Sequence, residues 1–206
     1  MAKSFGSIAF TPVVKALQEK HGSRRQYARQ EAARTAQDGL GPMELAFLAT
    51  IDHFYMASVG ETGWPYIQHR GGAKGFLKVI DPHLLAFGDF RGNKQYISTG
   101  NLTKDDRVAL ILVDYPTQSR LKILGHVEIV EGESARQWLE RVRDPNENTP
   151  IERVFLIHIE AFDWNCPQHI TPRYTAEQIR EAVMPLEEEI ERLRSELDKV
   201  KLPTAG

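Results

Sequence analysis

The sequence predicts a mostly β domain with flanking helices, an α+β protein whose short antiparallel strands form a barrel or a sandwich. Two observations predict this fold class. Between residues 50 and 162, short runs of aromatic and β-branched residues recur about every ten residues, separated by turn-forming Gly, Pro and Asp. The stretches before and after have the capping residues and apolar spacing of helices. Alternating βαβ units, which would indicate a parallel sheet, are not seen.

The first region, residues 1–49, is predicted to be helical. Pro12 can occupy the first turn of one helix, and residues 24–37 are rich in Ala, Arg and Gln. Gly41-Pro42 then marks a stop, and residues 43–48 form a short apolar helix. We therefore expect a small helical segment before the β domain.

The second region, residues 50–173, is expected to form the β domain. Turn signals such as Glu61-Thr62-Gly63 and Asp81-Pro82-His83 separate its strands. Helices are expected at residues 94–100 and 133–143, between strands. The predicted strands are Phe54–Val59, Trp64–His69, Phe76–Ile80, Leu84–Phe87, Val108–Val113, Leu121–Ile129 and Phe155–Phe162.

The third region, residues 174–206, is predicted to be a helical extension. Its apolar residues alternate at intervals of four and three, which is the a/d seam of a coiled coil. Pro185 interrupts the pattern, so we expect one helix over about 175–183 and a second with Pro185 in its first turn. The seam could pack on the chain's own barrel or pair with a second subunit. Its members are Ile179, Val183, Leu186, Ile190, Leu193, Leu197 and Val200.

Composition excludes several classes of function. The formal net charge is -2, without the basic surplus that a nucleic-acid-binding protein usually carries. The single cysteine, Cys166, excludes an internal disulfide and a multi-cysteine zinc site. No stretch approaches the roughly 20 apolar residues of a membrane helix, and residues 1–10 lack the features of a signal peptide. We expect a soluble cytoplasmic protein.

Two clusters combine glycine with cationic residues. In the first, His69, Arg70 and Lys74 surround Gly71-Gly72, whose backbone can approach a ligand closely. Arg and Lys there are suited to a phosphate. The alternative is a glycine-rich strand bend with two solvated cations.

The second cluster follows a predicted strand and precedes a predicted helix, as anion sites at helix N-termini do. It contains Arg91, Asn93, Lys94 and Gln95 beside Gly92. The spacing of a Walker loop is absent. A plain strand-to-helix turn is the alternative, but two such clusters in one small β domain favour phosphate binding.

A third unusual stretch, residues 163–173, contains Trp164, Gln168 and Arg173 in a proline-containing, irregular segment of the kind that often lines a site. Cys166 and His169 have a C-x-x-H spacing, but zinc binding would need further ligands. A nucleophilic Cys–His pair stays open as an alternative. Nothing in the sequence resembles a serine nucleophile elbow or a paired-carboxylate site.

The order of these motifs resembles the pyridoxamine 5'-phosphate oxidase-like family of FMN-binding split barrels. The resemblance covers roughly residues 45–175. Three stretches carry it most closely, and they resemble a subgroup regarded as FMN-dependent enzymes of unassigned substrate. They are HRGGAKGFLKV (69–79), DFRGNKQYISTGNL (89–102) and DWNCPQHITPRY (163–174).

The resemblance implies an antiparallel split barrel, a homodimer with FMN at the subunit interface, and a small-molecule substrate or electron donor. Arg70 and its backbone neighbours would meet the ribityl–phosphate region, and Lys94, with Asn93 and Arg91, would bind the phosphate. Trp164 and Arg173 of the other subunit would approach the isoalloxazine ring, where a cation stabilises anionic reduced flavin.

Several residues differ from those of the oxidase, and these differences argue against vitamin B6 oxidation as the function. Asn93 stands where the oxidase has an arginine next to its phosphate-binding lysine, and Leu121 replaces an expected amide. The late Arg-x-His substrate clamp is also missing. The leading hypothesis is an FMN-dependent oxidoreductase whose catalytic residue is unassigned, with His69, His169 and Cys166 near the ring as candidates. A flavin or haem carrier or sensor, and a reductase that uses F420, are the alternatives.

Overall fold

The computed structural model describes residues 3–33, 38–164 and 167–200. These residues form two compact units. One contains the chain up to residue 114 together with residues 119–167, and the other contains residues 115–118 and the chain from residue 168 onward.

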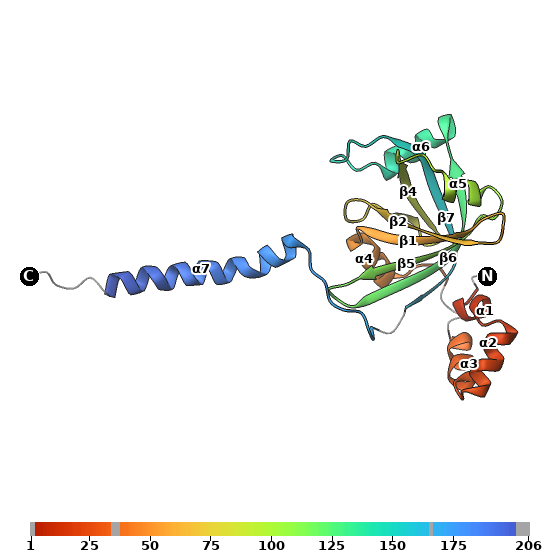
Figure 1. Ribbon diagram of the computed structural model, residues 1–206, viewed down its shortest axis with the longest axis horizontal. Coiled ribbons are helices and arrows are strands. Elements are labelled where there is room, and N and C mark those ends of the chain that lie inside the picture. Colours follow the sequence, from red (N-terminus) through yellow and green to blue (C-terminus); the bar gives the residue numbers. More distant parts are fainter. Residues whose placement is uncertain (1–2, 34–37, 165–166, 201–206) are drawn as a thin grey trace, which may run out of the picture. The chain divides into compact units, whose positions relative to one another are not determined.

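The first unit is built on one seven-stranded antiparallel sheet in the order β2-β1-β5-β6-β7-β4-β3 (Figure 1). Within the described chain its edge strands, β2 and β3, are not paired with each other, so the sheet curves without closing. The strands are β1 His53–Val59, β2 Pro65–Gly71, β3 Lys78–Asp81, β4 Leu84–Phe90, β5 Arg107–Asp114, β6 Ser119–Val130 and β7 Ile151–Trp164. All seven predicted strands are confirmed, with their ends shifted by a few residues.

Helices flank this sheet. Those expected from Pro12, over residues 24–37, 43–48 and 133–143 are confirmed where the chain is described, whereas the helix Phe5–Ala9 was not predicted. Pro12 opens its helix, with the Thr11 side chain accepting the N–H of Val14 as an N-cap. Within the described residues, no helix is both long and apolar enough to cross a membrane. The helices are α1 Phe5–Ala9, α2 Pro12–Lys20, α3 Arg24–Ala33, α4 Pro42–Thr50, α5 Ile97–Leu102, α6 Gly132–Val142 and α7 Ala176–Val200.

The core lies on the inner face of the curved sheet. On β1, Phe54 and Met56 are fully buried while the residues between them are not, as the two-residue period of a strand requires. Phe54 meets Phe87 edge-to-face, and Phe87 stacks on Phe155 with ring centroids 5.1 Å apart. Two of these rings, Phe87 and Phe155, lie next to Arg70, a residue of the site described below.

The start of α5 differs from the prediction. A helix was expected from Lys94, but α5 begins at Ile97. Lys94 and Tyr96 have φ angles of 61° and 53°, in the left-handed region that a right-handed helix excludes. The residues before the helix therefore form a turn instead of its first turn.

The second unit also differs from the prediction. The break expected at Pro185 is absent, because α7 is one continuous helix with Pro185 inside it. Proline removes one backbone hydrogen bond, but the remaining turns keep the helical path. The heptad spacing therefore runs uninterrupted through the helix.

Candidate functional site

A small hollow lies where β2, the end of β4, the turn before α5 and the start of β7 meet. Its volume is about 150 Å³. Three cations, Arg70, Lys94 and Arg153, line it together with two carboxylates, Asp89 and Glu152. The other lining residues are Tyr66, Gln68, Phe90, Gly92, Asn93, Gln95, Tyr96, Ile97, Ser98 and Thr99.

β2 contributes alternate side chains to the hollow. Tyr66, Gln68 and Arg70 line it, whereas Ile67 and His69, between them, are exposed. This alternation follows from the pleat of a strand, which directs successive side chains to opposite faces. Gln68 is fixed there because its Oε1 accepts a hydrogen bond of 2.6 Å from the hydroxyl of Ser98 on α5.

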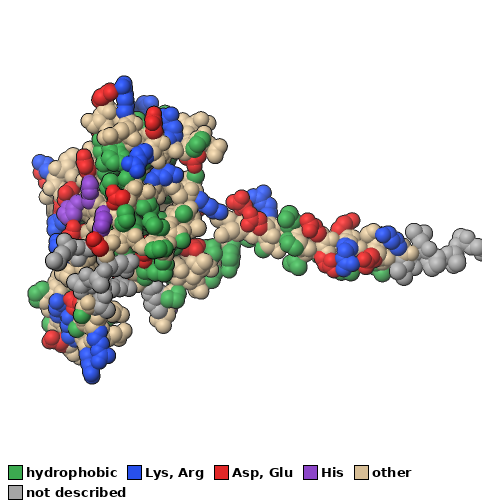
Figure 2. Space-filling view, turned by 180° about the vertical axis from the view of Figure 1, so that it is seen from behind, with side chains coloured by type: hydrophobic (Ala, Val, Ile, Leu, Met, Phe, Trp, Pro, Cys, Tyr) green, Lys and Arg blue, Asp and Glu red, His purple; other side chains and the backbone are tan. Residues whose placement is uncertain are grey.

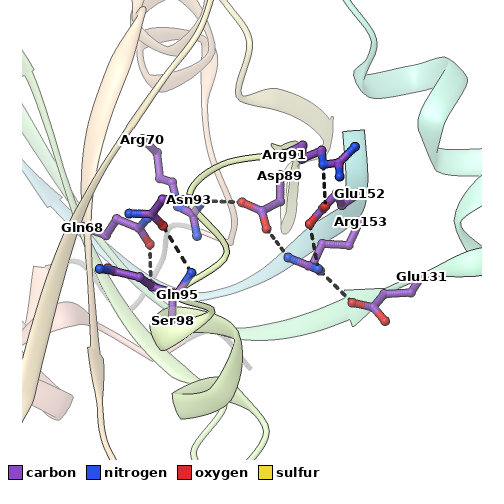
Figure 3. A network of polar contacts seen from close by, with 10 residues as sticks. All are labelled: Gln68, Arg70, Asp89, Arg91, Asn93, Gln95, Ser98, Glu131, Glu152 and Arg153. Atoms are coloured by element: carbon purple, nitrogen blue, oxygen red, sulfur yellow. Dashed lines mark hydrogen bonds and ion pairs between the residues drawn. The ribbon is translucent and has the colours of Figure 1, made fainter. Parts of the chain in front are cut away.

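Asp89 joins two arginines at the floor of the hollow (Figure 3). One carboxylate oxygen accepts from Arg70, and the other accepts from Arg153 over 2.7 Å. All three side chains are at least 87% buried, and Asp89 and Arg153 are directly paired between β4 and β7. Neutralisation of Asp89 by two cations makes this burial tolerable, because a buried charge needs partners.

Arg153 also reaches two other carboxylates. Its Nε donates to Glu131 over 2.7 Å, and one of its terminal nitrogens donates to Glu152 over 3.2 Å. Burial lowers the pKa of Arg153, but hydrogen bonds to Glu131 and Asp89 outweigh this effect and raise the pKa above its usual value. Arg153 therefore stays charged and fixed.

Arg70 has a buried donor without a partner in the described chain. Its guanidinium lies 5.5 Å from the ring centroid of Phe87 and 5.2 Å from that of Phe155, which adds cation–π stabilisation. Its Nε, however, is buried and has no hydrogen-bond partner among the described residues. A buried donor without a partner is costly, and this one belongs to a side chain that lines the hollow.

The turn before α5 presents Lys94. The side-chain oxygen of Asn93 accepts the backbone N–H of Gln95 over 3.2 Å, which fixes the turn (Figure 3). Lys94 is exposed, and among the described residues it has no ion-pair partner. Left-handed backbone at Lys94 and Tyr96 is strained for residues other than glycine, and such strain gathers at ligand-binding sites. The arrangement can bind an anion with an acceptor-rich surface, such as a phosphate.

Comparison with known proteins identifies the family. The family model for pyridoxamine 5'-phosphate oxidase matches residues 43–164, more than half of the chain. The chain belongs to this family. The resemblance and the split-barrel fold expected from the sequence motifs are thereby confirmed. No curated protein matches the sequence.

Solved structures with similar folds come from several bacteria. A candidate pyridoxamine 5'-phosphate oxidase of Lactobacillus delbrueckii is 21% identical, with 62% of this chain and 96% of that chain covered and a TM-score of 0.49. HupZ of Group A Streptococcus is 18% identical, with coverage of 66% and 100% and a TM-score of 0.47. An F420 reductase is 20% identical, with coverage of 57% and 94% and a TM-score of 0.43.

In this member of the pyridoxamine 5'-phosphate oxidase family, four of the predicted site residues line the hollow. They are Arg70, Asn93, Lys94 and Gln95. The side chain of Arg91 itself is exposed and lies 3.8 Å from Glu152, and its N–H donates to the carbonyl of Pro150. Arg91 therefore anchors the turn to the loop before β7.

The glycine pair lies at the end of β2, outside the lining of the hollow. Gly71 pairs with His53 of β1, and the N–H of Gly72 donates to the carbonyl of Asp52 over 2.9 Å. A Cβ at Gly72 would lie 2.8 Å from the Phe76 side chain, so glycine permits close packing here. His69 stacks on His53 on the outer face, and exposed Lys74 lines a separate shallow hollow with Leu45 and Val79.

Trp164 lies at the far end of β7 from Arg153. Its ring meets Phe47 of α4 edge-to-face, at 4.9 Å between centroids. Gln168 and Arg173 belong to the second unit, where the Arg173 guanidinium lies 5.0 Å from the centroid of the Tyr115 ring. Cys166 lies outside the described residues, and so does the alternative of a nucleophilic Cys166–His169 pair. Within the described residues, no cluster of three metal-ligating side chains occurs.

Sequence reasoning noted Asp89 only as the start of the stretch 89–102 and assigned it no role, and it missed Arg153. Each is a charged residue inside an apolar strand, and such a residue is almost never buried without a partner. That signal marks both residues as paired, but it does not identify the partner.

Proposed function

We propose that the protein binds FMN, with the phosphate in the hollow beneath Lys94, and that it acts as an FMN-dependent oxidoreductase on a small molecule. The observation that carries this proposal is the strained turn that brings Lys94, a cation without an ion-pair partner in the described chain, into the lining of the same hollow as the buried Arg70. Membership of the pyridoxamine 5'-phosphate oxidase family supports the choice of flavin.

The residues fit a phosphate. Lys94 supplies a mobile cationic donor, and the unpartnered Nε of Arg70 supplies a buried one. The two carboxylates in the lining are already held by arginines, so they repel an anion less than free carboxylates would. A hollow of about 150 Å³ is smaller than the roughly 300 Å³ at which sites for larger ligands begin. It therefore suits the phosphate end of FMN and not the whole molecule.

The rest of the cofactor needs a second surface. Trp164 is eleven residues from Arg153 along β7, roughly 36 Å of extended strand. Trp164 of the same chain is thus a poor candidate to meet a flavin whose phosphate lies near Arg153. We propose that the chain forms a homodimer in which the partner subunit supplies Trp164 and Arg173 to the ring.

In the bound state, FMN would accept a hydride or two electrons from a substrate. The protein would hold the phosphate with Lys94 and Arg70 and orient the cofactor. Arg173 would supply positive charge near the ring, which favours the anionic reduced flavin. No residue is assigned to proton transfer.

Binding and turnover test the proposal separately. The purified protein should be yellow or should bind added FMN, with the flavin fluorescence changing on titration. A colourless protein that does not bind FMN would refute the proposal. If FMN binds, anaerobic mixing with NADH, NADPH or reduced F420 should bleach the flavin. Flavin that stays oxidised with every donor would indicate a carrier or a sensor instead of an oxidoreductase.

A further inference from the structure

The apolar seam of α7 is exposed along its whole described length. Between 38% and 62% of each seam residue is exposed, although all six are hydrophobic. Apolar and charged side chains share the surface of this helix in Figure 2. Six regularly spaced apolar residues left in water favour association with another surface. The seam residues are Ile179, Val183, Leu186, Ile190, Leu193 and Leu197.

The identity of these residues favours a two-stranded parallel coiled coil. The spacing assigns Val183, Ile190 and Leu197 to heptad position a, and it assigns Ile179, Leu186 and Leu193 to position d. β-branched residues at position a combined with leucine at position d favour a parallel dimer. Val183 with Leu186 and Ile190 with Leu193, in the middle of the seam, follow this rule. Pro185 falls at position c, which faces away from the seam, and α7 continues through it.

The flanking charges favour the same orientation. In a parallel pair, position g of one helix faces position e of the next heptad on the other helix, so Glu189 would face Arg194 twice by symmetry. Glu187 would face the uncharged Ala182. In an antiparallel pair, position g of one helix faces position g of the other. Glu189 and Glu196 of one helix would then face the same carboxylates of the other helix.

Contacts within the helix leave these pairings available. Arg192, at position c, binds Glu189 over 2.6 Å and Glu196 over 2.7 Å. Arg194 has no ion-pair partner among the described residues, so its charge is available to another helix. A carboxylate can accept from two arginines at once, as Asp89 does in the barrel.

We propose that α7 pairs with α7 of a second copy of this chain as a parallel, in-register two-stranded coiled coil. The occupant of the seam is thus the same helix of another subunit. This inference does not depend on flavin binding, because it rests on α7 alone.

Disulfide trapping in the full chain tests the pairing. The natural Cys166 is replaced by serine, and Ile179→Cys or Leu197→Cys is added near either end of the seam. In a parallel in-register pair, equal a or d positions are close enough for a disulfide. Each variant should then form a covalent dimer on mild oxidation about tenfold more than the matched control Glu188→Cys, at outward position f. Yields are read on denaturing, non-reducing gels.

Two results would overturn the proposal. Yields at 179 and 197 equal to the control would mean that the seam is covered by something other than a second α7. A covalent dimer that forms when the Ile179→Cys and Leu197→Cys proteins are mixed, but with neither protein alone, would indicate an antiparallel pair, in which position d faces position a. Because these residues are exposed in the chain, the substitutions leave the barrel intact, and FMN binding measured in parallel reports any failure of the proposed function separately.

The charge assignment has its own test. Arg194→Glu in the Ile179→Cys protein should lower the trapping yield about threefold, because two symmetric attractions become repulsions. Adding Glu189→Arg should restore the yield. An unchanged yield with Arg194→Glu would contradict the parallel assignment.

Discussion

The indole of Trp164 donates a hydrogen bond to the carboxylate of Glu44, with Nε1 and Oε1 2.6 Å apart. Glu44 is only 2% exposed, and its second oxygen accepts the N–H of Gly41 over 2.9 Å. One buried carboxylate thus ties the end of β7 to α4 and caps that helix. Because both of its carboxylate oxygens accept a hydrogen bond, Glu44 can be buried without a large energetic cost.

Trp164→Phe should lower the free energy of unfolding by about 1–3 kcal/mol, because the buried Glu44 carboxylate loses a donor. Urea denaturation followed by circular dichroism measures the change. Trp64→Phe is the control, since Trp64 is 78% exposed, and it should alter stability by less than about 0.5 kcal/mol. Equal losses in the two variants would show that the Glu44 contact contributes nothing.

Lys94→Ala should weaken FMN binding about 10- to 100-fold, as expected for loss of a charge-assisted hydrogen bond. Riboflavin, which lacks the phosphate, should lose little affinity. Lys74→Ala is a matched control, because Lys74 is exposed and lines a different hollow. Fluorescence titration of both ligands with both variants decides the matter, and equal losses for FMN and riboflavin would remove Lys94 from the phosphate.

Asp89→Ala should destabilise the fold by roughly 3–5 kcal/mol, because two buried arginines lose their shared counter-charge. Glu131→Ala removes another carboxylate from Arg153, but Glu131 is 57% exposed and its loss should cost less than about 1 kcal/mol. Thermal and urea unfolding of the two variants give the comparison. Similar stabilities would contradict the role assigned to Asp89.

Asp105 should titrate unusually low. Hydrogen bonds from the side chain and the backbone of Arg107 lower the pKa of Asp105 from 3.8 to about 2. Because the folded-state pKa is depressed, its contribution to stability is present above about pH 4 and is lost as the pH falls toward 2. Arg107→Ala should return the pKa of Asp105 toward its ordinary value.

An NMR titration of the Asp105 carboxyl carbon measures this shift. Lys104→Ala is the control, since Lys104 lies 3.8 Å from Glu61 in an ion pair of its own. The stability difference between the wild type and Arg107→Ala should vanish below about pH 2, where Asp105 is protonated in both proteins. A pKa unchanged by Arg107→Ala would contradict the assignment.

Most of the fold could be predicted from local pattern. The alternation of buried residues such as Phe54 and Met56, and turn residues such as Asp81-Pro82, can be recognised from a few neighbouring residues of the chain. The start of α5 could not be predicted, because left-handed backbone at Lys94 and Tyr96 is imposed by the surrounding turn. The continuity of α7 was missed because the prediction relied on the local effect of Pro185. The free-energy cost of this proline is smaller than the stability of the helical turns around it.

The candidate site was predictable only in part. Lys94 and Asn93 could be found because glycine and cations cluster in sequence. The pairing of Arg70 was hidden, because Asp89 is 19 residues away and Arg153 a further 64. Such partners are selected by strand order in the sheet, which periodicity alone does not determine. The same limit explains why the Gly71-Gly72 pair suggested a ligand, although the N–H of Gly72 is used by Asp52.

The pairing of β4 with β7 has a consequence for synthesis on the ribosome. Asp89 emerges long before Arg153, because 64 residues separate them. Until β7 leaves the exit tunnel, β4 is an unprotected sheet edge and Asp89 has only one of its two arginines. At a synthesis rate of roughly 5–20 residues per second, this exposure lasts several seconds. The nascent chain therefore passes through an aggregation-prone stage that ends only when β7 docks.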